Sequence, residues 1–474
     1  MVFSSVTFLV FFLPLFVLIY QFIAREYKNW FILLSSILFY SWGAPKFVFV
    51  LVGVTIIDFY LVKYLDLART ITRKRLLLIV SLTMNLGILA YFKYANFFIE
   101  NVNSALHKLG METVGWTEVA LPIGISFYTF QTLTYAVDVY RNVHKPLESL
   151  SNYLLFIMAF PQMIAGPIVR YNLIADQIVS RNETTDDKLL GFVRFCIGLG
   201  KKVLIANVMG RQADLIMGQS PEDITTITAW IGILAYTFQI YFDFSGYSDM
   251  AIGLGRIMGF TFPENFNNPY NSRSITEFWR RWHMTLGQWM RDYLYIPLGG
   301  NKVKSRSRLF FNLWFVFVIS GLWHGASWNF VIWGAYHGVF LILERLFLGK
   351  LLQRIGTIPS VLFTFLVVVI GWVFFRIEYL SQAWAYLQKM FLFDFEPLNM
   401  VISPAFRFVS VLAALFSFIG LLKVGKRMEH AIYYRQDPGL TWYAYALPVS
   451  AVLFILSLSA VASEGFNPFI YFRF

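Results

Sequence analysis

The run Ser320-Gly321-Leu322-Trp323-His324-Gly325-Ala326-Ser327-Trp328-Asn329, followed by Trp333 and His337, decides the class of fold. It places two histidines inside an apolar segment that extends from Leu309 to Leu343. A titratable side chain in lipid is costly, so it usually faces protein or a water-filled cavity and serves a function there. The Gly and Asn residues around His324 indicate an interrupted helix, which a membrane tolerates only where protein or water lines the break. Thirteen residues of unbroken helix would put the two histidines on different faces, so a shared site requires the break.

The composition of the whole chain agrees with a membrane protein. Of its 474 residues, 58% are hydrophobic and 14% are charged, whereas soluble proteins carry about 25% charged residues. The net charge of +12 is explained by basic loops beside anionic lipid, without nucleic acid. One cysteine, Cys196, excludes an internal disulfide and a cysteine-based zinc site. We therefore expect a single integral-membrane domain over residues 1–474, with its core at 120–345.

Hydropathy predicts an all-α polytopic protein with about eleven to thirteen transmembrane or re-entrant helices. Met1–Ile23 has no basic leader and no clear cleavage site, so we expect it to be a retained first helix. Several later spans are shorter than the roughly 20 residues of a straight crossing, which indicates tilted or re-entrant segments. The later predicted spans are Trp30–Tyr40, Phe47–Val62, Leu76–Tyr94, Leu121–Tyr140, Tyr153–Val169, Leu189–Met209, Thr226–Phe242, Leu309–Gly321, Trp328–Leu343, Ile358–Phe375, Phe406–Leu422 and Trp442–Ala462.

The distribution of lysine and arginine predicts the orientation of these spans, because cytoplasmic loops are enriched in both. The assignments agree across the intervening helices, and they place Met1, the loop Arg376–Pro404 and the tail Glu464–Phe474 outside. The loops predicted to be cytoplasmic carry Arg25/Lys28, Lys63/Arg69/Arg73/Lys74/Arg75, Lys302/Lys304/Arg306/Arg308, Arg345/Lys350/Arg354 and Lys423/Lys426/Arg427/Arg435.

A second informative stretch, Ser272–Gly300, is amphipathic and rich in tryptophan and arginine. One interpretation is an interfacial helix with arginines among the headgroups and aromatic rings among the acyl chains. The other is a cytoplasmic vestibule in which Arg280, Arg281 and Arg291 bind a phosphorylated donor such as coenzyme A. Composition by itself favours the interfacial helix.

Two carboxylates, Asp243 and Asp249, follow the predicted span Thr226–Phe242. They are suited to orienting a histidine or binding a cation. They are equally suited to capping a helix junction in contact with solvent. The sequence leaves these alternatives open.

With these residues in view, the chain resembles the membrane-bound O-acyltransferase (MBOAT) family, and within it the bacterial alginate O-acetylation (AlgI-like) branch. Each matching piece is weak alone, but their ordered combination is specific and spans most of the chain. The pieces are Phe160–Ile168, Asp243-Phe244-Ser245-Gly246-Tyr247-Ser248-Asp249, Pro263-Glu264-Asn265-Phe266-Asn267-Asn268-Pro269-Tyr270, Phe278-Trp279-Arg280-Arg281-Trp282-His283 and Trp323-His324-Gly325. Related branches D-alanylate teichoic acids or acetylate peptidoglycan and cellulose.

The resemblance implies a catalytic role for His324 and a place for His283 on the cytoplasmic side of the same passage. It implies helices and re-entrant segments around a thinned centre, where a cytoplasmic donor, acetyl-CoA, meets an extracytoplasmic acceptor in the bacterial inner membrane. It implies no metal and no bound cofactor. It also implies a hydrolase-like (SGNH-type) extracytoplasmic acetyltransferase as partner, which passes acetyl to a polysaccharide such as alginate.

The residues suit acyl transfer. A neutral imidazole deprotonates a hydroxyl or takes the acyl group itself, and Trp323 and Asn329 are placed to orient the acyl carbonyl. A lone histidine in an apolar run is more often structural, but three of them lie near breaks, so His337 is a supporting candidate beside His324 and His283.

The tail Asn467–Phe474 carries one further candidate, Tyr471. The simple interpretation is an interfacial aromatic anchor. The tail also looks like the C-terminal peptide that accompanies the D-alanylating branch, which implies that the Tyr471 hydroxyl carries the acyl group. Two rival functions remain at this point. A transporter also uses broken helices, although no second copy of the Trp-His-Gly pattern is present, and a scaffold for a polysaccharide synthase needs no buried histidines.

Overall fold

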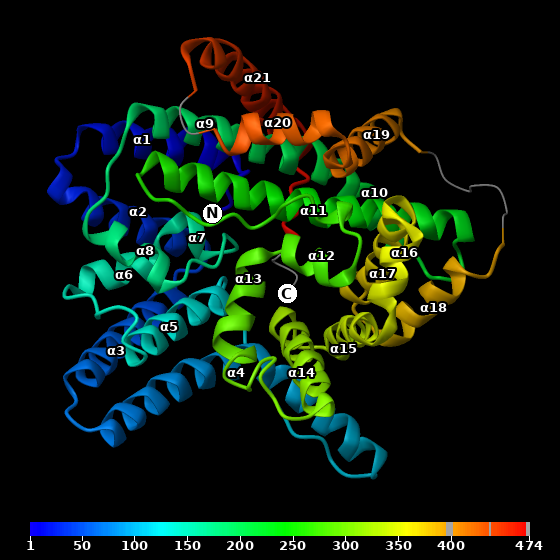
Figure 1. Cartoon of the computed structure of the whole chain (residues 1–474), viewed down its shortest axis with the longest axis horizontal. Coiled ribbons are helices and arrows are strands. Elements are labelled where there is room, and N and C mark those ends of the chain that lie inside the picture. Colours follow the sequence, from blue (N-terminus) through cyan, green and yellow to red (C-terminus); the bar gives the residue numbers. More distant parts are fainter. Residues whose placement is uncertain (395–401, 436–437, 471–474) are drawn as a thin grey trace. The chain divides into compact units, whose positions relative to one another are not determined.

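A computed structural model describes residues 1–394, 402–435 and 438–470, and in these ranges the regular secondary structure is helical throughout (Figure 1). The described chain forms two compact units. The first comprises Met1–Phe3, Thr7–Thr184 and Met258–Phe262, and the second comprises Ser4–Val6, Thr185–Ile257 and Pro263–Phe474. Every described site residue predicted above belongs to the second unit.

The first unit is held together by buried polar groups between apolar helices. The carboxylate of Asp58 accepts hydrogen bonds from Ser81 Oγ, Asn85 Nδ2 and the Tyr153 hydroxyl, at 2.5, 2.9 and 2.6 Å. These three hydrogen bonds satisfy the ionisable side chain of Asp58 inside the helix bundle. The elements are η1 Thr7–Phe12, α1 Leu13–Phe22, η2 Arg25–Tyr27, α2 Lys28–Gly43, α3 Phe47–Leu67, α4 Ile71–Lys108, α5 Ile125–Tyr140, α6 Leu150–Met158, α7 Phe160–Met163 and α8 Tyr171–Val179.

The second unit contains the longest buried helix, α11, and the two helices around the histidine motif, α14 and α15. Its elements are α9 Thr185–Gly200, η3 Lys201–Ala206, α10 Asn207–Met217, α11 Thr226–Ile257, η4 Pro269–Asn271, α12 Ile275–Arg281, α13 Met284–Trp289, η5 Met290–Tyr295, α14 Arg306–His324, α15 Trp328–Leu343, η6 Glu344–Leu348, α16 Gly349–Ile355, α17 Thr357–Arg376, α18 Leu380–Met390, α19 Pro404–Phe418, η7 Ile419–Leu421, α20 Lys423–Tyr433 and α21 Leu440–Glu464.

Two pairs of glycines bring α9 and α11 into direct backbone contact. A Cβ on Gly191 would lie 2.6 Å from the carbonyl oxygen of Gly253, and one on Gly198 would lie 2.5 Å from that of Gly246. Both pairs are seven residues apart on their helices, so they share one face. Small residues at this spacing let membrane helices approach closely, and α9 consequently runs along α11 (Figure 1).

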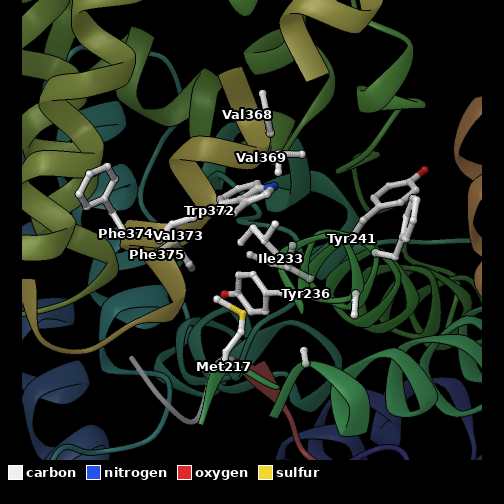
Figure 2. Close-up of a cluster of buried hydrophobic side chains, with 14 of the residues drawn as sticks. Met217, Ile233, Tyr236, Tyr241, Val368, Val369, Trp372, Val373, Phe374 and Phe375 are labelled. Carbon is white, nitrogen blue, oxygen red and sulfur yellow. The ribbon is translucent and has the colours of Figure 1, made fainter. Parts of the chain in front are cut away.

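The core of the second unit forms where α17 packs across α11. Figure 2 shows Val369 and Trp372 of α17 beside Ile233 and Tyr236 of α11, and all four are buried. The aromatic core continues through Trp282 and Trp333. It therefore surrounds the segments that carry the predicted site residues.

Six helices of the described residues are long and apolar enough to cross a membrane, which confirms the all-α, multi-pass membrane class. A shorter apolar segment, Thr7–Phe22, accompanies them. The six are Phe47–Leu67, Ile71–Lys108, Trp328–Ile355, Thr357–Arg376, Pro404–Leu421 and Leu440–Ser463.

Several predicted spans differ from the structure at their boundaries, and two of the differences have a clear physical reason. The predicted span Tyr153–Val169 is not one helix: α6 ends at Met158, and the proline after Phe160 starts a separate short turn, as expected for a residue that cannot continue a preceding helix. The predicted span Thr226–Phe242 continues to Ile257, because the acidic residues beyond Phe242 are buried and paired inside α11.

Candidate active site

His324 is the last residue of α14, at a break in the helical hairpin. The backbone becomes extended at Gly325 and α15 begins at Trp328, which confirms the break that the sequence predicts. A Cβ on Gly325 would run into the ring of Phe330, so the turn requires glycine. The imidazole is buried, with ring centroids of Trp333 and Phe375 both at 5.2 Å.

A small cavity of about 10 Å³ lies against His324. Its volume is close to the minimum that one water molecule needs. The wall is almost entirely aromatic and aliphatic, and it consists of Ile240, Phe244, Trp282, His324, Trp333, Trp372, Phe375 and Ile470. A group of one or two heavy atoms is the largest that fits without rearrangement.

His283 connects α12 to α13 in the left-handed backbone region, at φ 45°. Its Nδ1 lies 3.1 Å from Asn265 Oδ1, which also accepts from the Thr285 hydroxyl at 2.8 Å, while Asn265 Nδ2 donates to Ser248 Oγ at 3.0 Å. Asn265 therefore presents its carbonyl oxygen to the ring, and Nδ1 must carry the proton. The lone pair of His283 is thereby assigned to Nε2.

Nε2 of His283 has no hydrogen-bond partner within the described ranges. Burial lowers the pKa of His283 to about 3, so the ring is neutral at physiological pH. A neutral ring with a fixed tautomer and an unused lone pair is available to accept a hydrogen bond at Nε2. Trp323 lies beside both histidines, with its ring centroid 6.1 Å from that of His283 and 5.0 Å from that of His324.

The structure brings the two principal histidines together: their ring centroids are 6.4 Å apart. They come from segments about forty residues apart, one from the α12–α13 connection and one from the end of α14. His337 lies behind them in α15, fully buried, with Trp333 at 5.2 Å and Trp279 at 4.9 Å. It lines neither of the two cavities at the site, so its contacts make it a support for the aromatic wall.

A larger cavity of about 550 Å³ opens on the other side of His283. Three guanidinium groups line it, from Arg280, Arg291 and Arg345. Arg281 does not: its side chain bonds to Glu277 within α12 at 2.6 Å. The full lining is Thr276, Trp279, Arg280, Trp282, His283, Met284, Leu286, Gly287, Gln288, Met290, Arg291, Tyr295, Leu313, Val316, Phe317, Ser320, Leu341 and Arg345.

The two aspartates do not contact the histidines. Asp249 pairs with Arg194 and Lys201, at 2.6 Å each. Asp243 pairs with Lys202 at 2.7 Å. Both carboxylates are buried in the interior of α11, so the alternative of solvated helix caps is wrong.

Two further candidates have structural surroundings of their own. Asn329 donates a hydrogen bond to the Ile377 carbonyl and so ties the start of α15 to the end of α17. Tyr471 lies outside the described residues. The preceding residue, Ile470, lines the small cavity with His324.

Within the described ranges, no cluster of three or more His, Cys, Asp or Glu side chains is arranged to hold a metal ion.

Sequence reasoning missed three residues of this arrangement. Lys202 is a charge inside the predicted span Leu189–Met209, and the rarity of such charges is a signal that was available. Asn265 stands in the run Pro263–Tyr270, but nothing local shows that it would orient His283. Arg345 was assigned only to a basic loop.

Residues 67–377 match the family described as MBOAT, membrane-bound O-acyltransferase family. The chain therefore belongs to this family, and it is a multi-pass membrane enzyme that transfers acyl groups. It is 45% identical over 395 residues to the probable alginate O-acetylase AlgI of Pseudomonas aeruginosa, covering 83% of this chain and 75% of that protein. It is 40% identical over 492 residues to the probable alginate O-acetylase AlgI of Pseudomonas putida, covering all of both chains.

The peptidoglycan O-acetyltransferase of Helicobacter pylori is also similar, at 37% identity over 426 residues, or 82% of this chain and 80% of that protein. All three relatives carry names of O-acetylating enzymes. The transporter and scaffold alternatives are therefore set aside. The family and the AlgI-like resemblance predicted from the motifs are both confirmed.

Proposed function

We propose that this acyltransferase takes an acetyl group from acetyl-CoA on the cytoplasmic side of the bacterial inner membrane and delivers it to the extracytoplasmic side. The observation that carries the proposal is the histidine pair. His283 lines a large cavity with three arginines, His324 lines a small cavity beside Ile470, and the two rings are 6.4 Å apart. One histidine thus faces a donor site and the other faces an acceptor site.

The larger cavity suits coenzyme A. Its volume of about 550 Å³ falls in the usual range of small-molecule sites, about 300–1,000 Å³. Guanidinium groups bind phosphates bidentately. Arg280, Arg291 and Arg345 line the cavity, and Arg291 also pairs with Asp292 at 2.7 Å. Arg345 lies in η6 and not in a loop, but it belongs to the basic segment with Lys350 and Arg354 that charge predicts to be cytoplasmic, which supports entry of the donor from that side.

The proposed acceptor is the hydroxyl of Tyr471. Its oxygen attacks the thioester carbonyl carbon while His324 takes the phenolic proton. The carbon–sulfur bond then breaks, and the proton passes through His283 to the departing thiolate, which gives free coenzyme A and O-acetyl-tyrosine. The phenol ester is more activated than an alkyl ester because the leaving phenolate has a pKa near 10. It can therefore pass acetyl on to a second enzyme.

The proposed second enzyme is an extracytoplasmic hydrolase-like acetyltransferase, and the proposed polymer is alginate. The relatives that carry alginate in their names support this choice, at 45% identity and over the full chain length. Peptidoglycan is the second candidate, because the relative with that name matches 82% of this chain. Both termini are proposed to face the extracytoplasmic side, in agreement with the loop charges.

Tyr471→Phe tests the acceptor, because it keeps the ring and removes the nucleophile. We expect purified wild-type protein incubated with radiolabelled acetyl-CoA to gain one acetyl group on the peptide that contains Tyr471. The variant should remain folded and stay unlabelled. Normal polymer acetylation by Tyr471→Phe, with no acetyl-tyrosine found by mass spectrometry, would reduce this residue to an anchor.

The polymer is tested separately in cells. The gene is expressed in an alginate-producing strain that lacks its own O-acetylase, and ester-linked acetate is measured in purified alginate and in peptidoglycan. Ester-linked acetate found only in peptidoglycan would show that peptidoglycan, and not alginate, is the acetylated polymer.

A further inference from the structure

The segment Phe466–Ile470 lies inside the second unit like a bound peptide. Residues 465–469 are non-helical, yet Phe469 and Ile470 are each only 4% exposed. The ring of Phe469 stacks on Tyr247, with centroids 4.7 Å apart and planes at 28°. Ile470 lines the cavity of His324. The position of this segment along the chain therefore determines which residue comes next to that cavity.

A buried ion pair holds the main chain of this segment. Lys202 and Asp243 are 2.7 Å apart and their side chains are 2% and 1% exposed. Lys202 Nζ donates to the carbonyl oxygen of Pro468, and Asp243 Oδ2 accepts from the backbone N–H of Ile470 at 2.8 Å. A buried pair is stable only where hydrogen bonds satisfy its remaining polar atoms, and here the tail supplies two of them.

A third side chain extends the same pattern. Asn207 accepts from Lys202 Nζ at 2.9 Å and donates to the carbonyl oxygen of Phe466 at 3.3 Å. The contacted main-chain groups thus belong to residues 466, 468 and 470. Contacts at every second residue are the pattern by which one edge of an extended chain is recognised. The side chain of Asn467, between them, bonds to Ser4 through both its oxygen and its nitrogen, and its oxygen also accepts a longer bond from Asn207 Nδ2 at 3.5 Å.

We propose that Lys202, Asn207 and Asp243 form a main-chain slot that sets the register of residues 466–470, and so determines that Tyr471 is the residue delivered to His324. These three are positioning residues, and the second half of the inference rests on the proposed role of Tyr471. The alternative is an ion pair that only joins η3 to α11.

A charge swap separates the slot from a simple ion pair. In the double variant Lys202→Asp, Asp243→Lys, the pair can re-form, but the new acid cannot donate to Pro468 and the new lysine cannot accept from Ile470. The slot predicts a thermal midpoint close to wild type and faster exchange, by about tenfold or more, of the Ile470 amide, which donates to Asp243 in the wild type. Exchange unchanged from wild type would overturn the slot.

A matched pair of glycine insertions tests the register without touching the ion pair. One insertion precedes Gly465, around which there is open space for a Cβ, and the other stands between Ile470 and Tyr471. The slot predicts that the first keeps labelling of Tyr471 within a few-fold of wild type, because 466–470 dock again, and that the second lowers it by about tenfold or more.

The outcomes separate the two proposals. Equal loss in both insertions would show that chain length from α21 sets the register, and the slot would be wrong. Acetyl transfer that continues unchanged in both insertions and in Tyr471→Phe would contradict the relay, while amide exchange in the charge swap would still decide the slot.

Discussion

The two central histidines occupy opposite kinds of surroundings. His283 stands at the wall of a cavity of about 550 Å³ that carries three arginines, and Asn265 holds its ring in one tautomer. His324 stands against a cavity of about 10 Å³ walled by aromatic rings and Ile470. The first environment has the volume and positive charge to suit a large anionic molecule, whereas the second has room for a group of one or two heavy atoms.

The two environments suit different tasks: the His283 side suits binding of the donor, and the His324 side suits the acyl-transfer step. Charge and volume on the His283 side favour uptake of a nucleotide-bearing donor from water. In the proposed mechanism, the close packing around His324 limits access of water to the acyl group. Segments about forty residues apart place the rings of His283 and His324 6.4 Å apart, a distance that suits the proposed transfer between the two sides.

The largest expected effect comes from breaking the His324 side. His324→Ala removes the proposed base, and we expect acetyl transfer to fall by about 10³-fold or more, toward the upper range of general-base effects. Initial rates with radiolabelled acetyl-CoA measure this. His107→Ala is the matched control, because His107 is exposed at the end of α4. A rate for His324→Ala within a few-fold of that control would contradict the mechanism.

Asn265→Ala tests whether the His283 side depends on a fixed tautomer. The variant leaves the ring in place but removes the acceptor of its Nδ1 proton, so we expect kcat to fall by about 10- to 100-fold. The KM for acetyl-CoA should change little, because Asn265 does not line the donor cavity. Since Asn265 is buried, thermal stability is measured alongside. A folded variant with unchanged kcat would remove Asn265 from the mechanism.

The arginines sharpen the comparison on the donor side. Arg280→Gln and Arg291→Gln should each raise the KM for acetyl-CoA by about tenfold with less effect on kcat, as expected for lost uniform binding. Arg281→Gln is the control from the same helix, because its side chain bonds to Glu277 outside the cavity. An equal increase in the KM for acetyl-CoA from Arg280→Gln and Arg281→Gln would show that general positive charge, and not the cavity arginines, attracts the donor.

The size of the His324 cavity should select the acyl group. Phe375→Leu removes part of the wall and so enlarges the cavity beside His324. We expect the preference for acetyl-CoA over propionyl-CoA to weaken by about 10-fold or less, the usual range for one methylene. Phe374→Leu is the control, because the neighbouring residue does not line the cavity. Competition assays with both donors measure the ratio of acetyl to propionyl transfer. An identical ratio in the two variants would show that this cavity does not determine the choice of acyl group.

The smallest effect concerns acid stability. Because burial lowers the pKa of His283 to about 3, the unfolded chain binds a proton at this residue near pH 6.5 while the folded protein does not. Folded stability therefore falls as the pH decreases from 6.5 toward 3, by at most about 1.4 kcal/mol per pH unit. His283→Gln lacks this contribution, so its melting temperature should decrease less between pH 7 and pH 5 than that of wild type. Parallel decreases would show that His283 titrates normally.

Local features of the sequence are enough to predict the class of protein, the break at Gly325 and the importance of His283 and His324. Apolar composition and span length are local properties, and so is the rarity of a titratable side chain in an apolar run. A glycine beside His324 signals a break for the same local reason. The motif resemblance added the family, which the match over residues 67–377 confirmed.

Which side chains contact one another, by contrast, depends on how the helices pack. Arg280 and Arg281 are neighbours in one arginine-rich run, yet only Arg280 lines the cavity, because the rotation of α12 turns the other toward Glu277. Asp243 could not be matched with Lys202, nor His283 with Asn265, since each pair is made by chain segments that meet only after the helices pack. Hydropathy reports where a segment resides, whereas the partner of a buried polar group depends on the three-dimensional approach of distant residues.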